Sequence, residues 1–298
     1  MKNILPIDRF LRFLLAIFLC EGAYFWLSGT PQILAYLAGA VMLVTGASSF
    51  CPIYKVIGMG PSAASCSRMP ALWIRVVAVL VLVGAVVGGS YASAMFSKKV
   101  FLEDFNAMND FYKQTLFLTG KGEREKANAN YDQWVPAFEK FQRKYSVYRP
   151  LALRSDAQFD ADLAQVKGMM LAVKDAVKSG DLKQAHLDLE KVRPVFQEQF
   201  KRNGFSMLSV ALVDFHDVME LMLDAGNAKD ASKILALYEQ VNVKLKAIEA
   251  EANDAEIQAI RAQLDALNAL AKEGKTDALP AQADKLKTSF VKVYLKRG

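Results

Sequence analysis

Cysteine is scarce in this chain, and its distribution is uneven. The 298 residues contain three cysteines, Cys20, Cys51 and Cys66, and residues 97–298 contain none. This absence excludes a disulfide framework and a thiolate metal site from the last two thirds of the chain.

Charged residues are rare in the first third. Residues 1–96 hold six basic and two acidic side chains, whereas residues 97–298 hold 31 basic and 29 acidic ones. The net charge is therefore +4 in the first part and +2 in the second, with no basic stripe interleaved with aromatic residues. This balance excludes a nucleic-acid surface and indicates a membrane part followed by a soluble part.

Sequence motifs of catalysis and cofactor binding are also missing. The chain has no phosphate-binding glycine loop, no nucleophile elbow and only two histidines. A Cys-x-x-Cys-His motif is absent, which excludes covalent c-type haem. No stretch alternates with period two for long enough to predict a strand. We therefore expect an all-α, non-enzymatic protein without a cofactor.

Three apolar segments, at about residues 10–28, 33–50 and 71–96, are each close to the ~20 residues that a bilayer crossing requires. The five-residue connection Ser-Gly-Thr-Pro-Gln makes the first two a helical hairpin. The first segment lacks a small-residue cleavage site, so we expect it to be retained rather than removed as a signal peptide.

Basic residues in the short loops predict the orientation. They precede the first span and surround the loop before the third, while the hairpin turn carries no charge; they are Lys2, Arg9, Arg12, Lys55, Arg68 and Arg75. The positive-inside rule places the N-terminus in the cytoplasm. Three crossings then place residues 97–298 on the opposite side of the membrane, which is the periplasm if the membrane is the inner membrane of a Gram-negative bacterium.

Several residues of the first hairpin form an ordered set of motifs. They are Asn3, Asp8, Arg9 and Arg12, then Thr45 and Gly46, and finally Cys51-Pro52-Ile53-Tyr54 with Gly58. Over residues 2–60 this set resembles the YgaP-like inner-membrane hairpin domain. The resemblance implies a small bacterial membrane module that in some proteins is fused to a cytoplasmic rhodanese sulfurtransferase. This chain has no rhodanese domain and instead adds a third span and a large helical domain.

The membrane part offers four groups of candidate residues. Asp8 and Arg12, four residues apart, are expected to pair at the interface, where Arg9 and Arg12 also meet anionic headgroups. Glu21 is expected to form an interhelical hydrogen bond as a protonated acid, with a conduction path as the alternative. Small residues along the third span predict close helix packing against the hairpin or another copy; they are Gly84, Gly88 and Ala92.

The cysteines of the loop allow two interpretations. Cys51 is either a helix-end residue or a thiol that relays sulfur or electrons, and Cys66 shares its loop. Zinc requires four ligands and is not indicated by two cysteines alone.

The soluble part is predicted to be a tandem pair of four-helix units, residues 97–204 and 205–298. Its pattern predicts eight helices of roughly 18–24 residues, with breaks at glycine-containing turns. Residues such as Trp134 and Phe141 recur 104 positions later, at Tyr238 and Leu245, whereas Phe196 recurs 94 positions later, at Phe290. The difference predicts about ten extra residues in the first unit, at 146–155.

One predicted helix, residues 205–223, is apolar on nearly every face and carries four polar residues, Asp214, His216, Asp217 and Glu220. With Asp110 they are expected to form a buried polar cluster in which Asp110 and Asp214 hold a basic residue or a helix end. His216 and Glu220 are spaced to share a metal, and a bundle of this kind can also ligate haem. A satisfied structural cluster is the favoured interpretation.

The leading functional hypothesis is an accessory, assembly or sensor protein whose periplasmic bundle binds another membrane or periplasmic protein, or a second copy. The alternatives are a sulfur or redox relay through Cys51, and a small ligand, metal or haem near His216.

Overall fold

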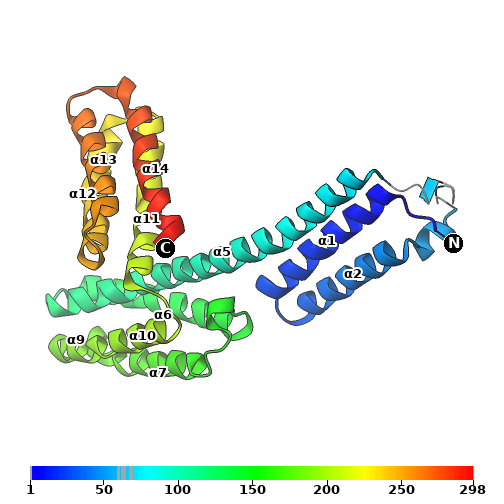
Figure 1. Cartoon of the computed structure of the whole chain (residues 1–298). Helices are drawn as coiled ribbons and strands as arrows, with labels where there is room; N and C mark the ends of the chain where they lie inside the picture. The colour runs from blue at the N-terminus through cyan, green and yellow to red at the C-terminus, as the bar shows by residue number, and fades with distance from the viewer. Residues whose placement is uncertain (1, 59–60, 62–64, 67–69, 298) are drawn as a thin grey trace. The chain divides into compact units, whose positions relative to one another are not determined.

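The computed structural model describes residues 2–58, 61, 65–66 and 70–297, and these residues form helices without a strand. The all-α prediction is therefore confirmed for this part of the chain. Two compact units are distinguished, unit 1 with residues 1–98 and 143–155, and unit 2 with residues 99–142 and 156–298. Figure 1 shows their helices, and each unit is described separately below.

Unit 1 is built on an antiparallel hairpin. Pro6 at the first position of α1 favours helix initiation, because proline's missing N–H has no intrahelical partner at that position. Ser49 ends the second helix in the left-handed conformation, with φ of 58°. The helices are α1 (Pro6–Phe25), α2 (Gly29–Ser48), the short α3 (Pro52–Val56) and the first part of α5 (Leu72–Gly120).

Helix α5 is the longest element, with 49 residues. It contains the predicted third span and continues past Phe96 without interruption into unit 2, as Figure 1 shows. Among the residues that the structure describes, two helices, α2 and α5, are long and apolar enough to cross a membrane. Helix α1 does not meet that criterion, because its 20 residues include Asp8, Arg9, Arg12 and Glu21.

After α5 the chain continues with further α-helices and two 3₁₀ turns, η1 in unit 1 and η2 in unit 2. Asp and Ser residues cap several of them: the side chains of Asp181, Ser206, Asp230 and Asp254 each accept a backbone N–H of the following turn. The elements are α6 (Arg124–Val147), η1 (Leu151–Leu153, assigned to unit 1), α7 (Phe159–Ala172), α8 (Lys174–Lys178), α9 (Leu182–Glu190), α10 (Val192–Arg202), α11 (Met207–Asn227), α12 (Ala231–Glu251), α13 (Ala255–Lys272), η2 (Thr276–Ala278) and α14 (Leu279–Arg297).

The expectation of eight long helices is wrong in the first half. Its third helix is interrupted at Val173 and its fourth at Lys191, giving α7 and α8, then α9 and α10. Pro194 accounts for the second interruption, because it has no N–H to donate to the carbonyl of Glu190. The expected break near Gly226 comes later, at Lys229, which adopts a φ of 56°.

Burial shows how the two halves of the soluble part correspond. Helix α12 begins at Ala231, 107 residues after α6 begins at Arg124, and at this shift buried residues match, for example Trp134 with Val241 and Phe138 with Leu245. The predicted shift of 104 instead pairs buried Trp134 with partly exposed Tyr238. At the predicted shift of 94, the later helices match, as in Phe196 with Phe290, Leu163 with Ile257 and Val192 with Leu286.

Candidate functional site

The residues that carry the hairpin motif meet at the junction of α1, α2 and α3. Asn3 binds the backbone of Cys51 twice: its Oδ1 accepts the Cys51 N–H at 2.7 Å, and its Nδ2 donates to the Cys51 carbonyl at 2.8 Å. The Asn3 N–H also donates to the Ser49 carbonyl. These bonds fasten the start of the chain to the segment that leaves α2.

A second set of bonds joins the charged turn of α1 to the end of α2. Arg12 Nε lies 2.9 Å from Asp8 Oδ1, and Arg12 Nη1 donates to Thr45 Oγ1 at 3.0 Å. Arg9 Nε donates to the Gly46 carbonyl at 3.0 Å. The guanidinium of Arg12 also lies 5.2 Å from the centre of the Tyr54 ring. Most of the motif residues therefore form one connected structure.

Residues 1–68 match the family model described as "Inner membrane protein YgaP-like, transmembrane domain". The match confirms the resemblance and supports placing this membrane protein in the inner membrane. It covers less than a quarter of the chain, so residues 69–298 must be understood from their own structure. The comparison with curated proteins found no match, and neither did the comparison with solved structures.

In the YgaP-like segment, the predicted Asp8–Arg12 ion pair is present. Arg9 donates a hydrogen bond to Gly46, and Arg12 donates to Asp8 and Thr45. These bonds give both arginines a role in closing the hairpin. Their contact with lipid headgroups stays a prediction.

Two of the three cysteines in the matched segment, residues 1–68, are buried. Cys51 is 4% exposed and Cys66 5% exposed, and all three cysteines are free. The Cys66 thiol lies 3.9 Å from the Pro61 carbonyl. Cys20 is partly exposed and packs against Gly39 of α2. Within the described residues, no group of three or more His, Cys, Asp or Glu side chains could hold a metal.

Glu21 faces α5. Ser90 Oγ donates to Glu21 Oε1 at 3.2 Å, an interhelical hydrogen bond in which Glu21 is the acceptor. The expected protonation of Glu21 stays a prediction. The carboxylate approaches the backbone of Gly89 so closely that a methyl group at that position would overlap it. Sequence reasoning missed both partners, because it followed the small residues at every fourth position and Gly89 lies beside that row.

The expected packing stripe on the third span does not contact the hairpin. A Cβ added at Gly84 or at Gly88 would meet nothing within 4 Å, and both glycines are exposed. Ala92 is partly exposed. The glycine that packs against α1 is Gly89 instead, because its position on α5 faces Glu21.

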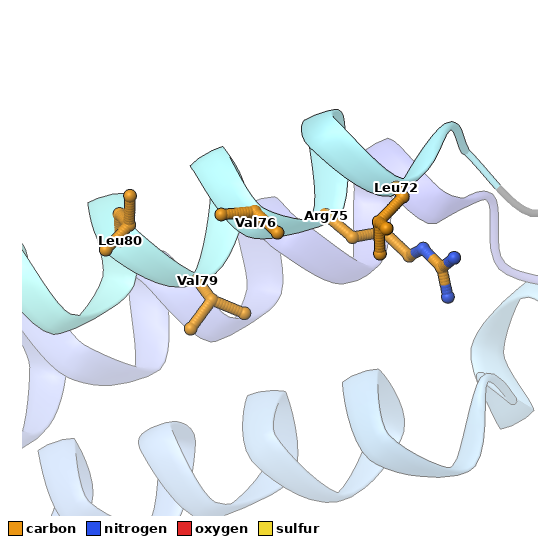
Figure 2. A pocket seen from close by; sticks show the side chains of 5 residues that line it. All are labelled: Leu72, Arg75, Val76, Val79 and Leu80. Carbon is orange, nitrogen blue, oxygen red and sulfur yellow. The ribbon is translucent and has the colours of Figure 1, made fainter.

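An open apolar hollow lies near the start of α5. Leu72, Val76, Val79 and Leu80 line it together with Arg75. Figure 2 shows the Arg75 side chain extending toward the N-terminal end of the helix, beside Leu72 and away from Val76, Val79 and Leu80. That direction is the one expected of a cation snorkelling to headgroups at the end of a span.

In unit 2, two aspartates and two lysines form an ionic cluster. Lys244 Nζ lies 2.7 Å from Asp214 Oδ2 and 3.6 Å from Asp110 Oδ2, and Lys113 Nζ lies 3.9 Å from Asp214 Oδ2. Burial alone would lower the pKa of Lys244, but the hydrogen bond with Asp214 and the charges of both aspartates raise it overall. The two aspartates thus hold basic residues, in keeping with the interpretation favoured from the sequence.

The ionic cluster is part of a polar stripe along one face of α5, formed by Lys99, Glu103, Asn106, Asp110 and Lys113. Lys99 Nζ donates to the Tyr294 carbonyl at 2.9 Å, and Asn106 Nδ2 donates to the Val210 carbonyl at 3.1 Å. The spacing of four and three residues keeps all five on one side of a helix. Polar contacts therefore join α5 to residues 205–298, the second half of the soluble part, together with ring contacts such as that of Phe101 with Phe205.

His216 lies in a separate acidic and aromatic environment. Its Nδ1 is 3.4 Å from Asp217 Oδ1, its Nε2 is 3.8 Å from Glu220 Oε1, and its ring stacks on that of Tyr294 at 5.3 Å. The hydrogen bond with Asp217 raises the pKa of His216, with further contributions from the charges of Glu220 and Glu103.

The predicted buried polar cluster is thus two groups. Asp110 and Asp214 share lysines, whereas His216 and Glu220 lie together. Asp214 is the buried carboxylate, with 12% of its side chain exposed, whereas Asp110 and Glu220 are more than 40% exposed. Asp214 and Glu220 differ in exposure because their positions on α11 point to different faces of the helix.

Proposed function

We propose that this protein is a non-enzymatic accessory, assembly or sensor protein, anchored in the inner membrane, whose periplasmic helical bundle binds a partner protein. The observation that carries the proposal is the continuity of α5. One helix of 49 residues contains a candidate membrane span and also supplies the first helix of the bundle. A partner that binds the bundle is thereby held at the membrane.

Three crossings give the proposed topology. The matched hairpin supplies two of them and α5 the third. The polar residues of α1 do not prevent a crossing, because Asp8, Arg9 and Arg12 bind within the hairpin and Glu21 binds Ser90. With the basic loops in the cytoplasm, residues 97–298 lie in the periplasm.

Reporter fusions to the C-terminus test this topology. We expect an alkaline phosphatase fusion to be active and a green fluorescent protein fusion exported through the same route to be dark. Fluorescence with an inactive phosphatase would overturn the periplasmic assignment.

The bundle is proposed to be a tandem repeat of two four-helix units. The matched burial at shifts of 107 and 94 residues supports this interpretation, with the change of shift falling between the second and third helices. Such a repeat provides outer helix surfaces for a protein partner, which is either another membrane or periplasmic protein or a second copy.

The polar groups that suggested chemistry have structural partners, which favours binding over catalysis. Cys51 is buried and fastened by Asn3, and His216 is stacked on Tyr294 beside two acids. A relay through Cys51 predicts that alkylation abolishes activity, and a ligand near His216 predicts bound metal or visible absorption that His216→Ala removes.

Purification of the intact chain in mild detergent, after cross-linking in cells, tests partner binding. We expect a partner in fixed stoichiometry that is retained by Cys51→Ser and by His216→Ala. As the control, the exposed charged residues of α12 and α13, within residues 205–298, are replaced by residues of the opposite charge. Loss of the partner with Cys51→Ser, or an uncomplexed monomer in every case, would contradict the proposal.

A further inference from the structure

Residues 143–155, here called the strap, comprise the end of α6 and most of its connection to α7, and they belong to unit 1. Tyr148 donates its hydroxyl hydrogen to the Phe25 carbonyl at 2.7 Å. Arg154 donates to the Tyr24 carbonyl and places its guanidinium 4.4 Å from the centre of the Tyr24 ring. Both side chains thereby satisfy carbonyls in the last turn of α1.

The end of α1 fixes the level of the strap in the membrane. Only Trp26, Leu27 and Ser28 separate α1 from α2, so this turn lies where the hairpin reverses at the bilayer surface. Tyr24 and Trp26 are both more than a third exposed there, as expected of aromatic residues at a membrane–water interface. A segment bonded to Tyr24 and Phe25 lies at the same interface.

The composition of the strap suits that position. Between Glu139 and Asp156 the chain has no acidic residue, while the strap alone carries Arg143, Lys144, Arg149 and Arg154. Two apolar side chains of the strap are exposed, Val147 at 70% and Leu151 at 37%. Basic residues beside exposed apolar ones are typical of segments that lie on an anionic membrane surface.

The strap is not needed to build a four-helix unit. In the second half, residues 252–254 suffice to connect α12 to α13, whereas residues 148–158 connect α6 to α7. The additional length is therefore available for another task. The strap contacts the hairpin through Tyr148 and Arg154, and Tyr148 is also hydrogen-bonded to Ser97 of α5.

We infer that the strap is a membrane-docking segment whose basic residues bind anionic phospholipid headgroups on the surface next to the α1–α2 turn. Arg143, Lys144 and Arg149 supply the charge, and Val147 and Leu151 enter the interface beside them. Tyr148 and Arg154 hold the segment on α1. The assignment of this surface to the periplasmic leaflet rests on the proposed function, whereas the docking itself rests on the bonds to Tyr24 and Phe25.

A fluorescent probe on the strap tests the inference in the full-length protein. Val147→Cys, in a chain whose three native cysteines are changed to alanine, is labelled with an environment-sensitive dye and placed in nanodiscs. We expect emission at shorter wavelength, and at least twofold stronger quenching by brominated lipid chains, in phosphatidylglycerol than in phosphatidylcholine. Val243→Cys on α12, also exposed, is the matched control and should respond equally in the two lipids.

Charge variants identify the residues responsible. Arg143→Gln, Lys144→Gln and Arg149→Gln together should abolish the difference between the two lipids in protein whose helical circular dichroism equals that of the parent chain. The control is Lys233→Gln, Lys272→Gln and Lys287→Gln, three exposed lysines of the second half that should leave the difference intact. Equal emission in the two lipids from the unmodified strap would overturn the inference.

Two further outcomes separate the sources and the hypotheses. If inorganic phosphate in phosphatidylcholine nanodiscs reproduces the shift, the strap is an anion site rather than a lipid-docking segment, and the inference fails. If the C-terminal reporter is cytoplasmic while the dye still responds to phosphatidylglycerol, the topology fails and the docking stands. A periplasmic reporter with an unresponsive dye refutes the docking alone.

Discussion

Asn3 holds Cys51 by both polar groups of the Cys51 backbone, accepting its N–H at 2.7 Å and donating to its carbonyl at 2.8 Å. The thiol takes no part in these bonds. The position of Cys51 therefore depends on the side chain of Asn3 and not on the sulfur. This relationship explains how two motif positions 48 residues apart act together.

We predict that Asn3→Ala destabilises the hairpin, whereas Cys51→Ser does not. Asn3→Ala removes two hydrogen bonds and leaves the Cys51 N–H unpaired, which costs about 1–3 kcal/mol, whereas the Cys51 carbonyl still accepts the Lys55 N–H. A lower Tm of the full-length chain in detergent, relative to Cys51→Ser, is the expected measurement. A Tm for Asn3→Ala equal to that of the parent chain would show that the hydrogen bonds between Asn3 and Cys51 do not stabilise the hairpin.

The burial of Cys51 gives a second prediction. Cys51 is 4% exposed, so a membrane-permeable maleimide should label it more slowly in the folded chain than in the denatured chain. Mass spectrometry of peptides sampled over time measures both rates. Asn3→Ala should accelerate labelling of Cys51. Equal rates for Cys51 in the folded and the denatured parent chain would instead favour a reactive thiol.

Gly89 and Gly88 form a matched pair for testing how α5 packs against α1. A methyl group at position 89 would overlap the Glu21 carboxylate, whereas one at position 88 would meet nothing within 4 Å. Gly89→Ala should therefore lower stability by about 1–3 kcal/mol, the usual cost of overpacking. Gly88→Ala should have no comparable effect.

Thermal unfolding of the two variants in nanodiscs measures the difference, and Glu21→Ala should rescue Gly89→Ala by removing the overlapping group. Equal Tm values for Gly88→Ala and Gly89→Ala would show that Glu21 is not held against Gly89.

The sequence was most informative where a pattern involved neighbouring positions. The hairpin, the Asp8–Arg12 pair and the shift of 94 residues for the later helices all follow from spacing along one helix. By contrast, Ser90 and Gly89 as partners of Glu21 depend on how α5 rotates about its axis against α1. A repeat of small residues does not determine that rotation, which is why Gly84 and Gly88 were chosen instead.

The repeat in the soluble part stays a prediction. Between α6 and α12, buried residues match at a shift of 107 residues, as in Trp134 with Val241, rather than at the predicted shift of 104. Burial depends on the core of the folded chain, so it can match at a different shift from the recurrence of residue types in the sequence. The strap likewise could be located by its length, whereas its bonds to Tyr24 and Phe25 join residues more than 120 positions apart.

Asp214 should contribute more to stability than Asp110. Asp214 is 12% exposed and lies 2.7 Å from Lys244, while Asp110 is 47% exposed and lies 3.6 Å from it. Asp214→Asn leaves the Lys244 ammonium without its closest acid and should cost about 1–3 kcal/mol. Asp110→Asn should cost less than about 1 kcal/mol, as for an exposed ion pair.

Unfolding of both variants in low and in high salt measures the two costs. The cost of Asp110→Asn should vanish in high salt, and most of the cost of Asp214→Asn should remain. An equal response of the two variants to salt would contradict the difference in burial.

The pKa of His216 predicts how stability depends on pH. In the folded chain, the Asp217 hydrogen bond and nearby acids raise the pKa of His216 above its ordinary value of 6.5. A raised pKa means that the folded state binds the proton more tightly than the unfolded state. The stabilisation is therefore complete below pH 6.5 and is lost as the pH rises through the folded-state pKa.

The groups around His216 act in known directions. Asp217, Glu220 and Glu103 favour its protonated form, and burial opposes it. Burial also raises the pKa of Glu103, so Glu103 should contribute its own loss of stability as the pH rises above 4.5. Measurement between pH 6 and pH 8.5 separates the histidine from Glu103, because Glu103 begins to change at lower pH.

His216→Gln should reduce the slope of Tm against pH in that interval while leaving the slope below pH 5.5 unchanged. His186, which lies near Glu190 in the first half, provides the control, since His186→Gln should leave the His216 contribution in place. The opposite result would be a Tm that rises with pH between 6 and 8.5 in the parent chain and no longer rises in His216→Gln. It would mean that the folded chain destabilises the protonated form of His216. The proposed pairing of His216 with Asp217 would then be wrong.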